Sequence, residues 1–271
     1  MSGTIVIGLL ELISKFVPKT SINRVVISPR SRRLVQLYES LPKPNKPKIY
    51  QIADDVLIEV NLLLPGERAI SFHAFEPTVT KRFLKMIKKG DVVIDLGAWI
   101  GYYSLLAAGK VGDKGRVISI EPHRTNYERI ESNIHLNNFK NVELLNLAVG
   151  DQLGTVVLKE GNDSLTHTIT GNEIGHQTRI DTVDNILKSL GVEYVSVIIM
   201  DIEGYEYFAL KGAKDALAKG CIKNIICEVH PNKLRLNGYT DTDVIKYLSS
   251  HGYKIEKLTT FDTCYHIHAR T

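Results

Sequence analysis

Apolar residues recur along this chain with two different periods. Short β-branched runs predict strands, and segments whose apolar residues recur every three or four positions predict amphipathic helices. From residue 78 onward the two kinds of segment alternate, which is typical of a doubly wound α/β sheet. Thr125 is an expected N-cap, with Glu128 at the capping-box position. Strands are expected at 92–95, 116–120, 141–148, 195–200 and 224–229, and helices at 78–88, from 102 onward, and at 125–137, 181–190, 205–217 and 241–250.

Two stretches depart from this alternation. The runs 155–158 and 165–170 alternate in polarity, as in an antiparallel pair joined by a polar turn. The runs 253–258 and 264–268 have the length and composition of two closing strands. Both pairs are expected to add strands beyond the alternating part of the chain.

Residues 1–71 are expected to form an N-terminal extension, and residues 72–271 the main domain. The proline-rich segment 41–47 is a connector that cannot be helical. Alternating runs at 49–64 predict a β-hairpin that covers the site. The extension is therefore a candidate lid or dimer contact.

The most informative segment is a strand, a turn and a helix at 92–106. A β-branched run ends in Asp95, a turn with Gly97, Ala98 and Gly101 follows, and a helix opens behind it. In an α/β protein this turn lies at the carboxyl edge of the sheet, where such folds bind ligands. The segment therefore marks a candidate ligand site.

The next strand also ends in an acid. Glu121 follows the run 116–120 and precedes Pro122. A carboxylate in this place can accept hydrogen bonds from the hydroxyls of a ribose. Together the turn and this acid predict a cofactor that contains a nucleoside.

The turn favours S-adenosylmethionine over a dinucleotide. A dinucleotide turn reads G-x-G-x-x-G, so that backbone amides approach the pyrophosphate. Here the middle glycine is absent, Trp99 stands in the turn, and Asp95 would repel a phosphate. S-adenosylmethionine has no phosphate; the turn amides could hold its carboxylate, and Asp95 could favour its amino group through water. The alternative is an ordinary strand–turn–helix unit with an acid at the strand end.

With these residues in place, the chain resembles the FkbM family of S-adenosylmethionine-dependent methyltransferases. The resemblance covers roughly 75–231 and is most specific at 201–206, which reads Asp-x-Glu-Gly-x-Glu after an apolar strand. Trp99 and Met200 depart from the family, which usually has a smaller polar residue and often a lysine there. The matching segments are 95–101, 120–122, 133–137, 148–151, 178–181, 200–206 and 227–231.

The resemblance implies a fold and a reaction. The fold is α/β, a Rossmann-like class I methyltransferase with a seven-stranded, mostly parallel sheet and a reversed last strand. The reaction is methyl transfer to an oxygen of a sugar, glycan, lipid, polyketide or related small molecule. Asp151, or an amide after Ala148, could read the amine of adenine, unless Asp151 is only a turn residue. The residues expected to line the cofactor are Glu76, Asp95, Gly97, Ala98, Gly101, Tyr102, Glu121, Pro122, Ala148, Val149, Asp151 and Asp201.

Three residues at the ends of later strands are candidates for catalysis. Asp201 follows the strand at 195–200, and Glu228 and His230 end the strand that begins at 224. Residues two apart in a strand share a face, so Glu228 and His230 should point the same way. His230 is the expected general base, because imidazole titrates near ~6.5, and Glu228 could orient it or hold the substrate. The alternative for Asp201 is a helix cap.

A magnesium ion is a second possible mechanism. Asp201 and Glu228, with Glu203, could hold Mg²⁺, which would bind substrate oxygens and lower the pKa of the acceptor hydroxyl. One aspartate and one glutamate are few protein ligands for Mg²⁺, so the mechanism with a metal-free base is preferred and no metal ligand is assigned. His167 and His176, in the insertion at 154–175 and just after it, are candidates to line the acceptor pocket.

Composition permits more than one acceptor. The net charge is +4, and much of the excess precedes Gly90, which permits an anionic partner without requiring one. RNA methylation is therefore an alternative, but the chain has no Asn/Asp-Pro-Pro-aromatic motif and no recognisable RNA-binding module. A non-catalytic S-adenosylmethionine-binding scaffold is another alternative, and the acids at successive strand ends argue against it.

The three cysteines and the N-terminal segment indicate in which cellular compartment the chain is expected. The cysteines have no C-x-x-C spacing, which predicts no disulfide framework and favours a reducing cytoplasm. The apolar segment 4–17 is interrupted by Glu11 and Lys15 and is too short to span a bilayer. We expect it to lie on the domain or on a second subunit of a homodimer, with peripheral membrane contact as the alternative.

Overall fold

The structure is a computed structural model of the 271-residue chain. It describes residues 46–160, 167–170 and 175–271. The predictions for the segment 4–17 and for most of the proline-rich connector lie outside the described residues. The chain divides into two compact units, Met1–Thr80 and Lys81–Thr271.

The described part of the first unit is a hairpin and a short helix. Strands β1 (Lys48–Ala53) and β2 (Val56–Val60) pair antiparallel, and the turn between them places Asp55 at φ 56°. Alternate residues of β2 are buried, as its polarity pattern predicted. Helix α4 (Pro65–Ser71) packs on both strands. The hairpin predicted from the alternating runs is therefore confirmed.

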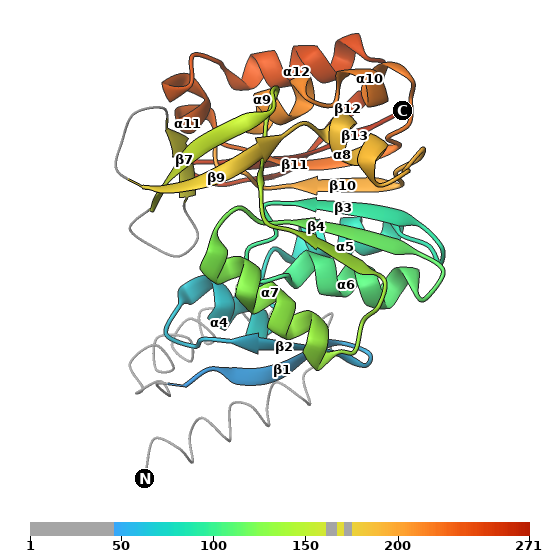
Figure 1. The fold of residues 1–271 in the computed structure, drawn as a ribbon, viewed down its shortest axis with the longest axis vertical. Helices are drawn as coiled ribbons and strands as arrows, with labels where there is room; N and C mark the ends of the chain where they lie inside the picture. Colours follow the sequence, from blue (N-terminus) through green and yellow to red (C-terminus); the bar gives the residue numbers. More distant parts are fainter. Residues whose placement is uncertain (1–45, 161–166, 171–174) are drawn as a thin grey trace. The chain divides into compact units, whose positions relative to one another are not determined.

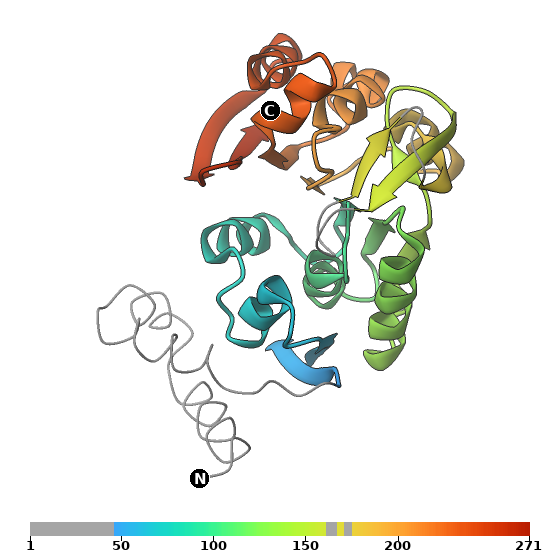
Figure 2. The same ribbon diagram turned by 90° about the vertical axis from the view of Figure 1, so that its left-hand side faces the viewer.

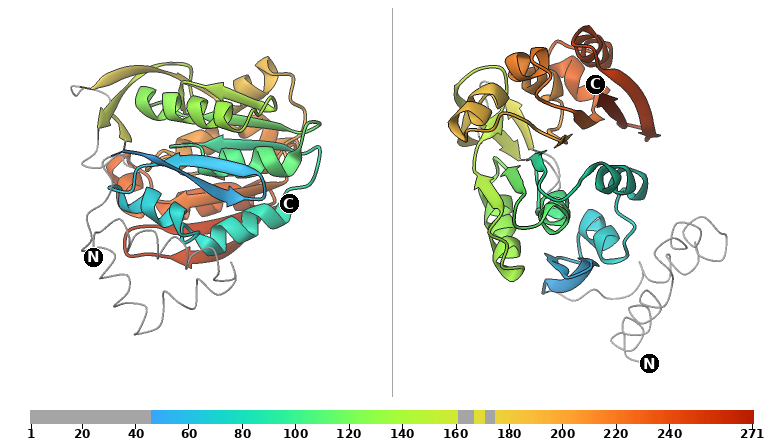
Figure 3. Two further views of the ribbon diagram at one scale, coloured as in Figure 1. Left: turned by 90° about the horizontal axis from the view of Figure 1, so that it is seen from below. Right: turned by 90° about the vertical axis from the view of Figure 1, so that its right-hand side faces the viewer.

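The second unit is built on a seven-stranded sheet with the order β12-β13-β11-β10-β3-β4-β5 (Figure 1). Neighbouring strands from β11 to β5 are parallel, and β13 is antiparallel to both of its neighbours. The β12–β13 hairpin, dark red in Figures 2 and 3, forms one end of the sheet. The mostly parallel sheet with a reversed last strand is confirmed. The strands are β3 (Val92–Leu96), β4 (Arg116–Ile120), β5 (Val142–Leu145), β10 (Val197–Met200), β11 (Asn224–Val229), β12 (Lys254–Thr260) and β13 (Tyr265–Arg270).

Helices cover this sheet and complete its core. Helix α6 packs on β3 and β4, α7 on β5, and α12 on β12 and α9. The central strands β10 and β11 are almost entirely buried, as continuous apolar runs predict for parallel strands. No helix among the described residues is both long and apolar enough to cross a membrane. The helices are α5 (Pro77–Met86), α6 (Tyr102–Val111), α7 (Arg124–Leu136), α8 (Val183–Ser189), α9 (Glu206–Lys211), α10 (Lys214–Ala218), α11 (Pro231–Leu236) and α12 (Asp241–Ser250).

A second, four-stranded sheet follows β5, with the order β6-β9-β7-β8. Its strands are β6 (Ala148–Val149), β7 (Gly154–Glu160), β8 (His167–Thr170) and β9 (His176–Asp181). The antiparallel pairing of β7 with β8 confirms the pair predicted there. The single strand predicted at 141–148 is wrong, because the chain leaves the large sheet after β5 and β6 pairs with β9. Asn146, between the two strands, donates from its side-chain amide to the carbonyls of Glu121 and Pro122.

Several predicted helix boundaries also differ. The helices expected at 78–88 and 181–190 are Pro77–Met86 and Val183–Ser189. Helix α7 begins at Arg124 with His123 in the N-cap position, so Thr125 is not the cap. The helix predicted at 205–217 is divided into α9 and α10 at Gly212 and Ala213, and Gly212 lies against the backbone of Gly150. A Cβ on Gly212 would come 1.9 Å from the carbonyl oxygen of Gly150, so the contact accepts only glycine. By contrast, α12 begins as predicted, with a capping box from Thr240.

Candidate active site

The turn between β3 and α6 is closed by bonds to the neighbouring strand. The amides of Gly97 and Ala98 donate to the carbonyl of Ile120 over 3.0 and 3.1 Å, and the amide of Gly101 donates to Ala98 over 2.7 Å. Gly97 and Gly101 have φ values of 81° and 89°, which glycine adopts without strain. These three amides therefore donate within the protein, and the expectation that the turn amides hold the cofactor carboxylate does not apply to them.

Gly97 also lies against the end of β10. A Cβ added to Gly97 would come 1.9 Å from the carbonyl oxygen of Asp201, and the amide of Asp201 donates to Leu96 over 3.0 Å. This contact places Asp201 beside the turn, as the strand order predicted. It also explains why the turn needs glycine at this position.

Gly97→Ala should destabilise the protein strongly. Gly220 provides a matched control, since it has φ 66° but nothing within 4 Å of an added Cβ. A left-handed alanine costs about 1–2 kcal/mol, so Gly220→Ala should lower the melting temperature modestly. Gly97→Ala should lower it clearly more, because the overlap with Asp201 adds to the same backbone cost. Equal melting temperatures of the two variants would contradict the close approach.

Asp95 is a buried acid that ties three elements together. It is 3% exposed, and its Oδ2 accepts a hydrogen bond of 2.6 Å from the hydroxyl of Ser104 in α6. Ser104 Oγ also lies 2.8 Å from the hydroxyl of Ser119 in β4. Burial raises the pKa of Asp95 to about 6, against the bonds from Ser104. Its predicted contact with the amino group of the cofactor remains a prediction.

Glu121 is the second buried acid at this edge, 4% exposed. Its Oε2 accepts a hydrogen bond of 2.8 Å from the amide of Trp99, and its Oε1 one of 3.0 Å from the amide of His123. The side-chain amide of Asn126 adds a longer bond of 3.4 Å. Burial raises the pKa of Glu121 to about 7, even against these donors. Glu121 therefore links the turn after β3 to the start of α7, where a ribose was predicted.

The acids at this edge fit a nucleoside with a cationic amino-acid end. Two adjacent parallel strands, β3 and β4, end in buried carboxyl groups whose pKa values are raised by burial. Hydroxyl donors from a ribose, or a positive charge nearby, would favour the ionised forms of such groups. A phosphate would not. The residues present therefore suit S-adenosylmethionine better than a dinucleotide.

Other predicted cofactor residues have partners of their own. Tyr102 is 7% exposed, and its ring packs edge-on against Tyr103 at 5.1 Å. Asp151 Oδ2 lies 2.6 Å from Lys211 Nζ in an ion pair, so this carboxylate is held at α9. Its predicted role at adenine stays a prediction. Asn146, which was not singled out from the sequence, is the polar side chain that contacts the backbone of Glu121.

Three further predicted residues complete the set. Ala148 and Val149 are buried in β6. Glu76 lies in the first unit, immediately before α5, with φ 39°. Their cofactor contacts remain predictions.

A cluster of acids surrounds His230 at the ends of β10 and β11. His230 Nδ1 lies 2.8 Å from Glu206 Oε1, and its Nε2 lies 3.2 Å from Glu203 Oε2 and 3.9 Å from Asp201 Oδ1. His230 itself is 8% exposed, whereas the side chain of Asp201 is 47% exposed. The structure therefore brings the predicted base and Asp201 together, with Nε2 on the side of the more open acid.

Glu206, not Glu228, holds the imidazole of His230. Glu206 is fully buried, and its Oε1 also accepts a 2.8 Å bond from the amide of Gly204. Its Oε2 is buried and has no hydrogen-bond partner among the described residues. Burial lowers the pKa of His230, but the bond to Glu206 and the charges of Glu206, Glu203 and Glu228 outweigh it, so the pKa lies above its usual value. The prediction that Glu228 orients His230 is therefore wrong.

Glu228 belongs to a neighbouring group of side chains. The thiol of Cys264 donates to its Oε1, and His266 Nε2 lies 3.7 Å from its Oε2. Burial raises the pKa of Glu228, but the charges of His266 and His230 and the bond from Cys264 bring it below its usual value. His266, from β13, therefore contacts an acid at the site. Its neighbour His268 bonds Asn224.

The cluster contains a cation of its own. Lys233 Nζ, from α11, pairs with Glu203 Oε2. The ligand atoms of Asp201, Glu203 and His230 lie within 4.8 Å of one another, a spacing that an ion could also use. Because Lys233 already neutralises Glu203, this arrangement does not require Mg²⁺. Glu203 is considered from the sequence only as a possible Mg²⁺ ligand, and Lys233 has no role predicted from the sequence.

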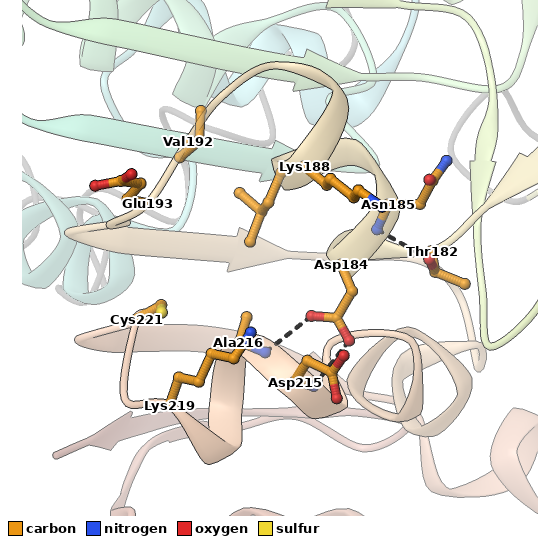
Figure 4. Close-up of a pocket in the computed structure, with 11 residues that line it drawn as sticks. Thr182, Asp184, Asn185, Lys188, Val192, Glu193, Asp215, Ala216, Lys219 and Cys221 are labelled. Atoms are coloured by element: carbon orange, nitrogen blue, oxygen red, sulfur yellow. Dashed lines mark hydrogen bonds between the residues drawn. The ribbon is translucent and has the colours of Figure 1, made fainter.

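An open cavity of about 510 Å³ lies elsewhere, between α8 and α10 (Figure 4). Val192 and Cys221 line it, and both precede their strands, β10 and β11. It therefore lies at the opposite edge of the sheet from Asp201 and His230. Asp184 in its wall accepts bonds from the amides of Asp215 and Ala216 and so caps α10. None of the predicted site residues lines this cavity.

Fold and site together define a class I methyltransferase: the sheet order, the reversed strand, and acids at the ends of β3 and β4 beside a glycine turn. Residues 95–255 match the model of the methyltransferase FkbM domain, which is more than half of the chain. The chain belongs to this family of S-adenosylmethionine-dependent methyltransferases. The resemblance inferred from the sequence is thereby confirmed.

Two curated relatives match part of the chain at moderate sequence identity. Ribosomal RNA large subunit methyltransferase E of Methanothermobacter thermautotrophicus is 32% identical over 111 residues, 38% of this chain and 49% of that protein. The protein of the same name from Methanobrevibacter smithii is 32% identical over 137 residues, 47% of this chain and 61% of that protein. The chain thus spans about half of the length of these relatives.

Among solved structures, the methyltransferase FkbM of Methylobacillus flagellatus KT is similar. Its TM-score is 0.45 at 19% identity, covering 74% of this chain and 53% of that one. A likeness of this degree says nothing about the acceptor.

Proposed function

We propose that the protein transfers the methyl group of S-adenosylmethionine to a hydroxyl oxygen of a sugar, glycan or other small hydroxylated molecule, with His230 as general base. The observation that carries this proposal is the 2.8 Å bond from His230 Nδ1 to the buried Glu206. An imidazole held in this way keeps its proton on Nδ1 and presents Nε2 as an acceptor. Nε2 lies 3.2 Å from Glu203 Oε2 and 3.9 Å from Asp201 Oδ1, so the acceptor hydroxyl would take the place of Glu203 beside Nε2.

The chain's own groups would move one proton. Held at Glu121, S-adenosylmethionine would supply an electrophilic methyl group for the acceptor oxygen, and S-adenosylhomocysteine would be the leaving group. The hydroxyl proton passes to Nε2 of His230, and the imidazolium that forms is stabilised by Glu206 and Glu203. Lys233 Nζ and His230 Nε2 both contact Glu203 Oε2. The pairing with Lys233 would hold this carboxylate when the acceptor hydroxyl approaches Nε2. Asp201 is more exposed than Glu203 and Glu206 and would accept a hydrogen bond from a second hydroxyl of the substrate.

The rate should rise with pH. A base acts in its neutral form, and the pKa of His230 lies above its usual value because of Glu206 and the neighbouring acids. The rising limb of kcat/KM should therefore have its midpoint above ~6.5, the value for an unperturbed imidazole. Glu206→Gln removes the charge that favours the imidazolium, so it should move the midpoint to lower pH and reduce the maximum rate. A midpoint that Glu206→Gln leaves unmoved would argue against the pairing.

RNA methylation is the second candidate function. The two curated relatives, both named ribosomal RNA methyltransferases, favour it. The charge of the site argues against it, because the exposed carboxylate of Asp201 would face the phosphates of a polynucleotide. The glycan proposal is therefore preferred.

A label-transfer assay separates the two candidates. The purified chain is incubated with methyl-labelled S-adenosylmethionine and, in parallel, with neutral oligosaccharides, glycolipids and ribosomal RNA. Label on a sugar, retained in excess chelator, supports the proposal and its metal-free base. Label on RNA alone would replace it with the second candidate, and loss of transfer in chelator would restore the magnesium mechanism.

A further inference from the structure

The turn between β12 and β13 lies at the same edge of the sheet as the proposed base. Strand β13 runs antiparallel to β11, with Glu228 opposite His266 and Val229 opposite Tyr265. The residues just before Tyr265 therefore lie beside the end of β11, where His230 follows. The amide of Phe261 closes the turn by donating to the carbonyl of Cys264 over 2.8 Å. The turn therefore lies at the edge of the sheet where the acceptor is proposed to bind.

The turn is tied to the acids of the site. Cys264 donates its thiol hydrogen to Glu228 Oε1, and His266 bonds Thr259 in β12 over 2.8 Å. The pairing of β12 with β13 shifts register between Lys257 and Thr259, a bulge of the kind that re-aims neighbouring side chains. The tip of the hairpin is thus bonded to Glu228 through Cys264, next to β13, and follows a register shift in β12.

Phe261 holds an exposed ring at this tip. It is 51% exposed, and its ring lies 6.0 Å from the ring of His266 in an edge-on arrangement. His266 in turn faces Glu228 at 3.7 Å. Of the aromatic side chains among the described residues, Phe261 and Tyr194 are the exposed ones. Tyr194 precedes β10 and so lies at the opposite edge.

We infer that Phe261 is the surface on which the acceptor ring lies, and that the acceptor is an uncharged pyranoside; this inference rests on the proposed function. One face of a pyranose carries mostly C–H groups, and burial of such a face against an aromatic ring is favourable. Its rim carries hydroxyls, for which Glu228 and Asp201 are acceptors. A nucleobase could stack on the same ring, but its phosphates would meet Asp201, Glu228 and Asp262.

Binding can be measured before the natural acceptor is known. The full chain, saturated with S-adenosylhomocysteine, is titrated with maltotriose, cellotriose, mannotriose and a short RNA oligonucleotide while saturation transfer to ligand protons is followed by NMR. At least one trisaccharide should receive saturation at its ring C–H protons. Phe261→Ala should weaken that binding by about tenfold, Phe261→Trp should preserve it, and Tyr194→Ala should leave it unchanged.

Three results would overturn the inference: equal sugar binding by Phe261→Ala, equal loss in Tyr194→Ala, or no binding of any trisaccharide by the wild-type protein. Calorimetric binding of S-adenosylhomocysteine is measured on each sample. If the cofactor product binds and the sugars do not, the acceptor surface is wrong and the methyltransferase assignment stands. If the cofactor product fails to bind to folded protein, the proposed function itself fails.

Discussion

His230→Ala should reduce methyl transfer by about 10²–10⁴-fold, the range that a general base contributes. The reason is geometric: Nδ1 is bonded to Glu206 at 2.8 Å, so Nε2, which lies 3.2 Å from Glu203, is the nitrogen left to take up the proton of the acceptor. Because His230 lies among Asp201, Glu203 and Glu206 rather than beside Glu121, the affinity for S-adenosylhomocysteine should change little. Single-turnover rates and calorimetry on the same preparation give both quantities.

The control for this variant is His251→Ala. His251 follows α12 and bonds the carbonyl of Tyr247, so it is an imidazole outside the cluster. It should retain the wild-type rate. If His230→Ala also retained that rate, His230 would not be the base, and substrate positioning or a metal ion would have to explain catalysis.

Glu121→Ala should produce the largest loss of cofactor affinity, on the order of 100-fold. Hydrogen bonds to a charged acceptor contribute about 1.5–3 kcal/mol each, and a ribose offers two hydroxyls. The same carboxylate holds the amides of Trp99 and His123, so the turn is loosened as well. Calorimetric titration with S-adenosylhomocysteine measures the effect.

The same group predicts a pH dependence of binding. The pKa of Glu121 is raised to about 7 by burial, and the ionised form is the better acceptor for hydroxyls. Affinity should therefore increase as pH rises through about 7 and should lose this dependence in Glu121→Ala. Glu131→Gln, an exposed acid on α7, should change neither. Undiminished binding by Glu121→Ala would show that the ribose lies elsewhere.

The strands and their order could be predicted because each carries its own signal. Residues 92–96, 116–120 and 224–229 are short runs rich in β-branched residues, and the structure buries all but the first residue of each. The acids Asp95, Glu121 and Asp201 follow such runs directly, so their place at one edge follows from the parallel order. The local sequence pattern is therefore sufficient to predict the parallel strands and the edge at which these acids lie.

The differences arise where a distant backbone group decides the local structure. At the break between α9 and α10, Gly212 packs against Gly150, which is far away in sequence. The end of β5 depends on pairing of β6 with β9. Periodicity within one segment cannot reveal such contacts, because each contact depends on a second segment that lies elsewhere in the sequence.

The same reason explains the missed partner of His230. Glu228 was favoured because it stands two residues away on the same strand, whereas the observed partner, Glu206, begins a helix in another part of the chain. The signal for Glu206 was present in the Asp-x-Glu-Gly-x-Glu segment. What the sequence lacked was the turn at Gly204, with φ 95°, whose amide bonds Glu206 beneath the imidazole. Cys264, which bonds Glu228 from the β12–β13 turn, had no local signal.

The most direct test is a crystal structure of the full chain with S-adenosylhomocysteine. The account predicts that both ribose hydroxyls bond Glu121 and that the sulfur faces the edge where Asp201 and His230 lie. In that position an acceptor oxygen at Nε2 of His230 can approach the methyl carbon opposite the sulfur. A nucleoside bound away from Glu121, or a sulfur directed away from His230, would contradict the account.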